Sequence, residues 1–272
     1  MGSSADRRYL NGATIMSMPT LRQLEIARET GYDGIEARAE RLLTDAAEVA
    51  NAAAGVRPGE VLSLNGIRIG LQADGTLLRD ELESDLRARL DVCEAIRARY
   101  LLVVPPRVPG LSEATALPGI RDGLLLARDV AAARTVAVAF EFLGFADCPI
   151  ATPAAAAAVV DGLADVELVL DSCHWHASGS GPIDALPVER LAVVHLNDAP
   201  PIPPRSIEDG DRLLPGEGVI RLGELVGELR ARGYDGPWSL ETFNPTYWED
   251  APEDVASRGA LALERLLGTR AG

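Results

Sequence analysis

Short apolar runs alternate with longer amphipathic segments along the 272-residue chain. Runs rich in β-branched and aromatic residues are typical of strands, whereas apolar residues at helical spacing indicate amphipathic helices. The pattern predicts eight strands, at residues 9–15, 32–38, 60–66, 100–106, 135–142, 166–172, 191–198 and 237–243. It predicts helices near residues 19–30, 39–53, 77–98, 112–133, 152–163, 183–189, 220–232 and 252–267. Several predicted helices begin at typical start signals, namely Thr20, Thr152 followed by Pro153, and Pro252.

This alternation predicts a fold of the α/β class. Strands separated by helices pair in parallel through right-handed crossovers, and eight repeats at this length fit a single-domain (β/α)8 TIM barrel. An open doubly wound sheet is the alternative, but its usual GxGxxG turn does not follow the first strand. We expect residues 1–8 to be a flexible N-terminal extension. The Pro-rich stretch 199–218 is expected to be a long active-site loop, because such loops in compact domains are usually functional.

Composition narrows the partners and excludes several enzyme classes. The formal net charge of −15 opposes binding to nucleic acid and to anionic membranes. No apolar run reaches the roughly 18 residues of a membrane span, and residues 1–10 lack the apolar stretch of a signal peptide, so we expect a cytoplasmic protein. All 26 basic residues are arginine, which excludes Schiff-base, pyridoxal-phosphate and P-loop chemistry. The expected partners are a small molecule and, in a homo-oligomer, further copies of the chain.

The last four predicted strands each end in a residue that can bind a metal ion. These residues are Glu141, Asp171, His195 and Glu241. In a barrel of this kind the carboxyl ends of the strands meet at one mouth, so the four side chains converge. Three buried carboxylates without a cation would cost several kcal/mol per unpaired charge, which favours a divalent metal ion. Three oxygen donors and one nitrogen suit Mn²⁺, our first choice, or Mg²⁺, Co²⁺ or Zn²⁺.

Other polar and aromatic residues at the predicted mouth are candidate contacts for a polyol substrate. They are Asn11, Glu36, Arg38 and Asn65 from the first three strands, and Trp175 and His176 after the sixth. Glu36 and Arg38 lie two residues apart on one strand, so an internal ion pair between them is an equal alternative to substrate contact. Trp175 is a candidate apolar wall for a sugar ring. His176 either contacts the substrate or packs near the mouth.

Segments spread over nearly the whole chain resemble a known family. They are LNGATI, GYDGIEAR, LSLNG, YLLVVPP, AFEFLGFADC, LVLDSCHWHASGS, VHLNDAP, DGDRLLPGEGVI and WSLETFNPTYW. The sequence resembles the sugar-phosphate isomerase/epimerase family of xylose isomerase-like TIM barrels, and within it the enzymes that isomerise 2-keto-myo-inositol (inosose). Two departures are Asn197, where an acidic residue is expected two positions after His195, and Glu217 in the Gly-x-Gly turn.

The resemblance assigns roles to individual residues. It implies the metal ligands Glu141, Asp171, His195 and Glu241, in agreement with the strand-end argument. It further implies that Glu141 and Glu241 act as the acid/base pair, and that His174 and Arg212 contact substrate oxygens, His174 as part of the catalytic set.

The predicted function is that of a divalent-metal-dependent isomerase or epimerase of a keto-polyol or ketose, acting through a metal-stabilised enediolate. Two alternatives stay open. A dehydratase of the inosose or 3-dehydroshikimate type would use the same metal and base but expel a β-hydroxyl group. The chain could instead be the binding or catalytic subunit of a two-protein deglycosidase. An endonuclease of the same superfamily is disfavoured, because three histidines and the acidic charge supply neither several zinc ions nor a basic groove.

Overall fold

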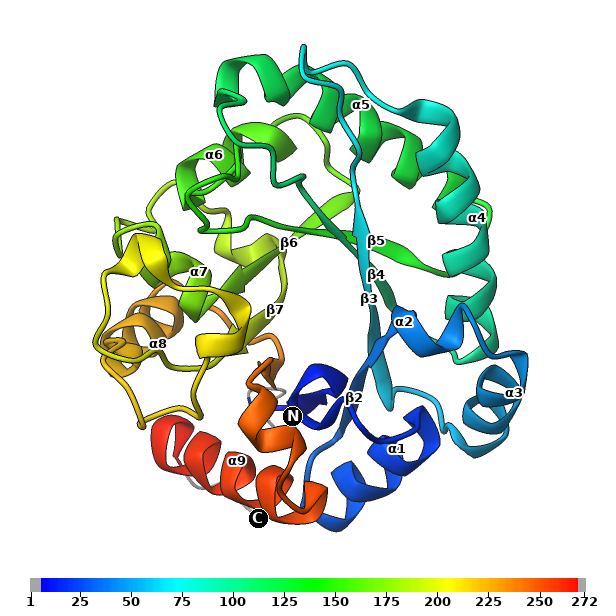
Figure 1. The fold of residues 1–272 in the computed structure, drawn as a ribbon, viewed down its shortest axis with the longest axis vertical. Coiled ribbons are helices and arrows are strands. Elements are labelled where there is room, and N and C mark those ends of the chain that lie inside the picture. The colour runs from blue at the N-terminus through cyan, green and yellow to red at the C-terminus, as the bar shows by residue number, and fades with distance from the viewer. Residues whose placement is uncertain (1–5, 269–272) are drawn as a thin grey trace.

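Eight parallel strands close into a barrel in chain order, and helices form a ring outside them (Figure 1). The computed structural model describes residues 6–268. The strands are β1 (Arg8–Asn11), β2 (Gly34–Arg38), β3 (Val61–Arg68), β4 (Tyr100–Val104), β5 (Ala137–Glu141), β6 (Val166–Asp171), β7 (Leu191–Leu196) and β8 (Trp238–Leu240). All eight predicted strands are present, which confirms the single-domain TIM barrel.

The helices of the outer ring follow the strands in turn. They are α1 (Thr20–Glu29), α2 (Ala39–Leu42), α3 (Ala46–Gly55), α4 (Arg79–Ala95), α5 (Glu113–Ala131), α6 (Pro153–Val160), α7 (Ser172–Ala177), α8 (Leu222–Ala231) and α9 (Pro252–Leu267). Short 3-10 helices lie at Gly12–Ile15, Val188–Arg190, Pro204–Ser206, Asp209–Asp211 and Pro245–Trp248. No helix among residues 6–268 is long and apolar enough to cross a membrane.

Start signals in the sequence match several helix ends. Thr152 caps α6 by accepting a hydrogen bond from the Ala155 amide, and Pro153 occupies the first helical position. The barrel closes where β8 pairs with β1, and α9 lies beside α1 (Figure 1). One large core cluster of strand and helix residues contains Trp238, which is 1% exposed, and a separate cluster of strand residues includes Tyr9, Tyr100 and Val193.

Two sequence expectations differ from the structure. Residue Arg8 belongs to β1 and pairs with Trp238, so the expected N-terminal extension is too long; residues 1–5 lie outside the described residues. The helix expected at 183–189 lies instead at Ser172–Ala177, because the Asp171 side chain caps a helix directly at the end of β6. The stretch 199–218 is a long loop, as expected, with two short 3-10 helices and a β-bridge from Leu213 to Asp198.

Candidate metal centre and active site

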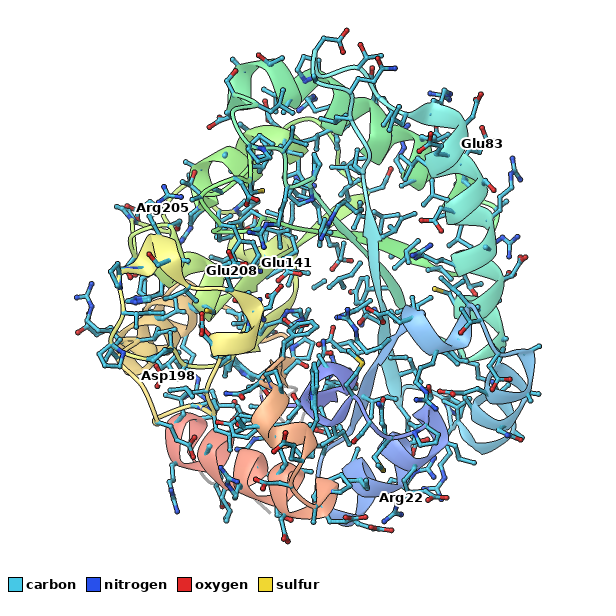
Figure 2. The ribbon with its side chains drawn as sticks, in the orientation of Figure 1. Arg22, Glu83, Glu141, Asp198, Arg205 and Glu208 are labelled. Carbon is cyan, nitrogen blue, oxygen red and sulfur yellow. The ribbon has the colours of Figure 1, made fainter. Side chains whose placement is uncertain are left out.

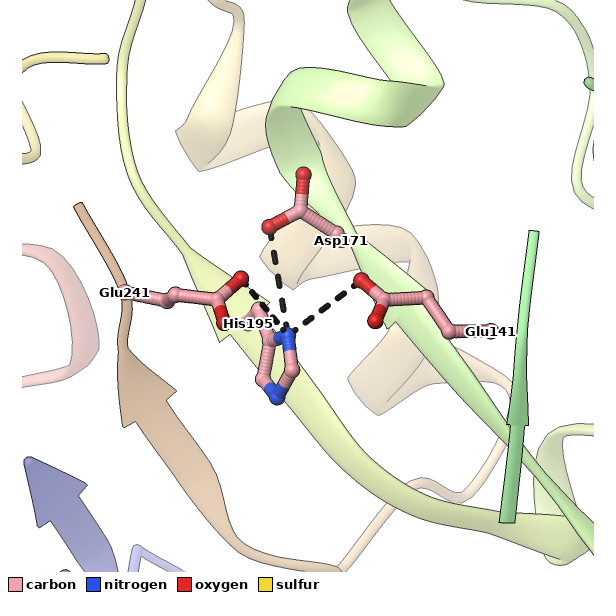
Figure 3. A group of neighbouring side chains, drawn as sticks. All are labelled: Glu141, Asp171, His195 and Glu241. Atoms are coloured by element: carbon pink, nitrogen blue, oxygen red, sulfur yellow. Dashed lines mark ion pairs between the residues drawn. The ribbon is translucent and has the colours of Figure 1, made fainter. Parts of the chain in front are cut away.

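Four strand-end side chains converge inside the mouth of the barrel. One potential ligand atom from each of Glu141, Asp171, His195 and Glu241 lies within 4.8 Å of the others, and all four residues are buried. His195 Nδ1 lies 3.2 Å from a Glu241 oxygen, 3.4 Å from Glu141 Oε1 and 4.0 Å from Asp171 Oδ2 (Figure 3). Register explains the convergence, because Asp171 pairs with His195 across β6 and β7, and Glu241 directly follows β8.

The donor set fits a divalent ion. Within the described part of the chain, Glu141 Oε1 and His195 Nδ1 are buried and have no hydrogen-bond partner. Buried polar atoms are nearly always paired, so two orphans that face each other across the same space indicate a missing partner. Three carboxylates and one imidazole nitrogen are suitable ligands for a hard or borderline divalent cation.

Each oxygen of Asp171 has a separate contact. Oδ1 accepts a hydrogen bond of 2.8 Å from the His174 amide and so caps α7. Oδ2 faces the centre and accepts a hydrogen bond of 2.7 Å from Asn197 Nδ2. The short helix therefore fixes the candidate ligand and places His174 directly beside it.

Asn197, which the sequence marked only as a departure from the family pattern, makes contacts at the site that the sequence did not predict. It is fully buried, and its Nδ2 also donates to the backbone oxygen of Glu241 at 2.9 Å. Its Oδ1 accepts a hydrogen bond from Ser172 Oγ at 2.9 Å. The amide thus connects the ends of β6, β7 and β8. Its position two residues after His195, on the same side of the strand, was the available signal.

Arg212 reaches from the long loop onto the same carboxylates. It is 1% exposed, and its Nη1 lies 2.7 Å from Glu241 Oε2 and 3.2 Å from Asp171 Oδ2. Its Nη2 lies 3.0 Å from His174 Nε2. A guanidinium only donates hydrogen bonds, so His174 accepts through Nε2 and carries its proton on Nδ1. Burial, and then the charge of Arg212, lower the pKa of His174 to about 3, so the ring is neutral.

The two glutamates of the centre have pKa values shifted in opposite directions. Burial raises the pKa of Glu141 to about 7, assisted by Glu241 and Asp171 and opposed by His195. Burial also acts to raise the pKa of Glu241, but His195 and Arg212 outweigh it and lower that pKa overall. One carboxyl is therefore ready to carry a proton while the other is ionised, which is the arrangement of an acid/base pair.

A cavity of about 370 Å³ opens above the centre. Its walls include Glu141, His174, Arg212 and Glu241 at the inner end and Phe145 and Phe243 as apolar surface. Figure 2 shows Glu141 toward the middle of the ring of helices, whereas Arg22 and Glu83 lie on the outer helices. This volume suits a ligand of sugar size.

Glu208 joins the long loop to the opposite side of the mouth. Its carboxylate accepts two hydrogen bonds from Arg107, at 2.7 and 3.0 Å. Arg107 also donates to Asp147 at 2.7 Å and stacks 4.1 Å above the ring centre of Phe145. At the base of the loop, the buried Asp198 carboxylate accepts backbone hydrogen bonds from 199, 216 and 220. The loop is therefore fixed at both ends.

Comparison with known proteins places this barrel in a family. The sequence pattern of the Xylose isomerase-like TIM barrel family matches residues 24–266. The chain belongs to this family. It is 28% identical over 269 residues to the inosose isomerase of Bacillus velezensis, covering 94% of this chain and 95% of that protein. It is 25% identical over 257 residues to the inosose isomerase of Halalkalibacterium halodurans, covering 91% of each.

The same fold recurs among solved structures. A crystal structure of the IOLI protein with a bound zinc atom matches with a TM-score of 0.86 and 24% identity, covering 96% of this chain and 98% of that chain. The similarity extends over the whole xylose isomerase-like barrel.

In this xylose isomerase-like barrel, the predicted substrate contacts fall into two groups. Arg38 and Asn65 line the cavity, together with His174 and Arg212. The ion pair between Glu36 and Arg38, which was the alternative to substrate contact, is wrong, because Arg38 pairs with Glu40 at 2.7 Å and lies 3.8 Å from Glu241.

The remaining predicted contacts do not line the cavity. Asn11 and Glu36 are fully buried behind Glu241 and His195. Trp175 packs in the core and donates to the Gly181 carbonyl, so it is no wall for a sugar ring. His176 points to Ser180, with Nδ1 and Oγ 3.3 Å apart. None of these four side chains lines the cavity, so the structure gives no support to substrate contacts at these positions.

Proposed function

We propose that this protein is a divalent-metal-dependent isomerase or epimerase of a keto-polyol or ketose, with an inosose-like cyclitol as its substrate class. The observation that carries this proposal is the buried set of three carboxylates and one imidazole, with two orphaned ligand atoms, at the inner end of a cavity of sugar size. The inosose isomerases among its relatives support the same class.

Glu141, Asp171, His195 and Glu241 are the proposed metal ligands. Mn²⁺ is our preferred ion on the basis of the oxygen-rich donor set, with Mg²⁺, Co²⁺ and Zn²⁺ as the other suitable ions. When bound, such an ion supplies a Lewis acid that polarises a carbonyl and its neighbouring hydroxyl group.

The side chains around the centre supply proton transfer and orientation. Glu141 and Glu241 are the proposed acid/base pair, because their pKa values are held apart. His174 Nδ1 is buried, bears the proton, and has no partner among residues 6–268, so it is available to donate to a substrate oxygen. Arg212 offers positive charge beside the same oxygens, while Arg38 and Asn65 lie on the cavity wall for the more distant hydroxyl groups.

Incubation of the metal-loaded protein with 2-keto-myo-inositol in D₂O tests the proposal. Proton transfer next to the carbonyl predicts deuterium at the α-carbon and a product of otherwise unchanged composition. Loss of water with a new conjugated absorbance would instead establish the dehydratase. Activity of the isolated chain would refute the two-protein deglycosidase. If neither deuterium incorporation nor a mass change is observed, both the isomerase and the dehydratase are refuted for this substrate.

Glu141→Gln and Glu241→Gln are each expected to abolish turnover, because each removes a titrating carboxylate that also faces the proposed ion. Glu81→Gln, an exposed position on α4, is the matched control and should leave the rate unchanged. Steady-state rates of the three variants decide the point, and full activity in either site variant would remove that residue from the mechanism.

The homo-oligomer and the cytoplasmic location remain predictions. Sedimentation of the purified chain and fractionation of cells test them in turn.

A further inference from the structure

Glu36 is a fully buried carboxylate that belongs neither to the proposed ligands nor to the cavity wall. We infer that Glu36 is a positioning residue that holds the His195 ring with Nδ1 toward Glu141, Asp171 and Glu241. The inference rests on the proposed function, because it concerns the residue that presents the only nitrogen donor of the proposed metal site.

Contact between Glu36 and His195 is direct. His195 Nε2 lies 3.0 Å from Glu36 Oε1 and 3.2 Å from Oε2, and both side chains are fully buried. A carboxylate only accepts hydrogen bonds, so the Nε2 proton is donated to Glu36. The other ring nitrogen, Nδ1, is then the atom that can bind an ion. Carboxylates commonly fix metal-binding histidines through the second nitrogen in this way.

Glu36 is itself held in place by neighbouring strands. Ser63 Oγ, on β3, donates to Glu36 Oε2 at 2.7 Å. Asn11 Nδ2, on β1, lies 3.4 Å from Glu36 Oε1 and 2.9 Å from Glu241 Oε1. Asn11 therefore connects the positioning carboxylate to one of the proposed ligands. Three strands, β1, β2 and β3, thus contribute to the orientation of the imidazole carried by β7.

Glu36 is fully buried and does not line the cavity, whereas Glu141 and Glu241 do. It lies two residues before the end of β2, whereas Glu141 and Asp171 are the last residues of their strands. Its carboxylate contacts Nε2 of His195, whereas Glu141 and Asp171 face Nδ1 on the other side of the ring. Its direct contact with the proposed ligands is the one with His195, and Asn11 provides an indirect link to Glu241.

Glu36→Gln tests the inference with Zn²⁺ as the probe ion. The variant keeps the shape and one acceptor but removes the charge that fixes the ring. We expect the Zn²⁺ dissociation constant, measured by calorimetry on metal-free full-length protein, to rise about 10- to 100-fold. Glu48→Gln is the matched control, because Glu48 is also buried and hydrogen-bonded, to Thr20 and Arg41, but lies away from the centre. It should bind Zn²⁺ as the unmodified protein does.

A second measurement needs no variant. The chain has three histidines, so ¹⁵N-histidine labelling gives a simple spectrum. In the Zn²⁺-loaded protein we expect one ring with its proton on Nε2 and its Nδ1 resonance displaced by the ion. Binding through Nε2 would overturn the inference even if Glu36→Gln failed to fold.

The outcomes separate the two claims. If the unmodified protein binds no divalent ion, the proposed function fails and this inference falls with it. If the unmodified protein binds Zn²⁺ and Glu36→Gln binds it within twofold, only the positioning role of Glu36 is refuted. A selective loss in Glu36→Gln, with Glu48→Gln unchanged, supports the inference.

Discussion

Replacing Asn197 with alanine should destabilise the metal-free protein by about 2.5–6 kcal/mol. The change removes a hydrogen bond of 2.7 Å to the Asp171 carboxylate. A hydrogen bond to a charged group contributes about 1.5–3 kcal/mol. It also removes two neutral hydrogen bonds, to the Glu241 carbonyl and from Ser172, each worth about 0.5–1.5 kcal/mol. No water can replace them easily, because Asn197 is fully buried.

Urea unfolding in the presence of a chelator measures this effect. With a slope of about 3 kcal/mol per molar urea, the midpoint should fall by about 1 M or more while the slope stays constant. Asn51→Ala is the control, since Asn51 is exposed on α3, and it should change the stability by less than about 0.5 kcal/mol. A loss below about 1 kcal/mol for Asn197→Ala would refute the view that this amide holds the ends of three strands together.

Three further predictions concern the glycine beside α7, the long loop and proton release. A Cβ at Gly144 would lie 2.0 Å from the His174 carbonyl oxygen, so Gly144→Ala should displace His174 and lower the melting temperature measured by thermal unfolding. The control is Gly227→Ala on α8, where a Cβ meets open space, and it should leave the melting temperature unchanged or raise it. Arg107→Ala releases Glu208, so trypsin should cut faster after Arg205 in the same loop; an unchanged rate would show that the contact does not restrain it. Divalent-metal binding should tighten as the pH rises from about 6 to about 8, because the raised pKa values of Glu141 and His195 require protons to leave before an ion binds. Calorimetry in buffers of different ionisation enthalpy should detect the released protons. An affinity that does not change with pH would contradict this prediction.

Much of the candidate site could be read from the chain because it depends on strand ends. In a parallel barrel the carboxyl ends of all strands meet at one mouth, so apolar runs ending in Glu141, Asp171 and Glu241 were sufficient to bring these side chains together. His195 followed the same rule. The sequence thus determined the barrel, its eight strands and the four members of the centre.

Only the tertiary structure decided how deep each polar side chain lies. Period-two alternation tells which side of a strand a residue faces, but not which layer of the barrel it occupies. Glu36 and Asn11 therefore looked like substrate contacts, although they lie behind His195 and Glu241. The helix after β6 was likewise misplaced, because its start depends on one oxygen of Asp171 capping the backbone while the other faces the centre. Arg212 needed the folded loop to bring it across the mouth, since contacts between distant segments are set by packing and not by local sequence.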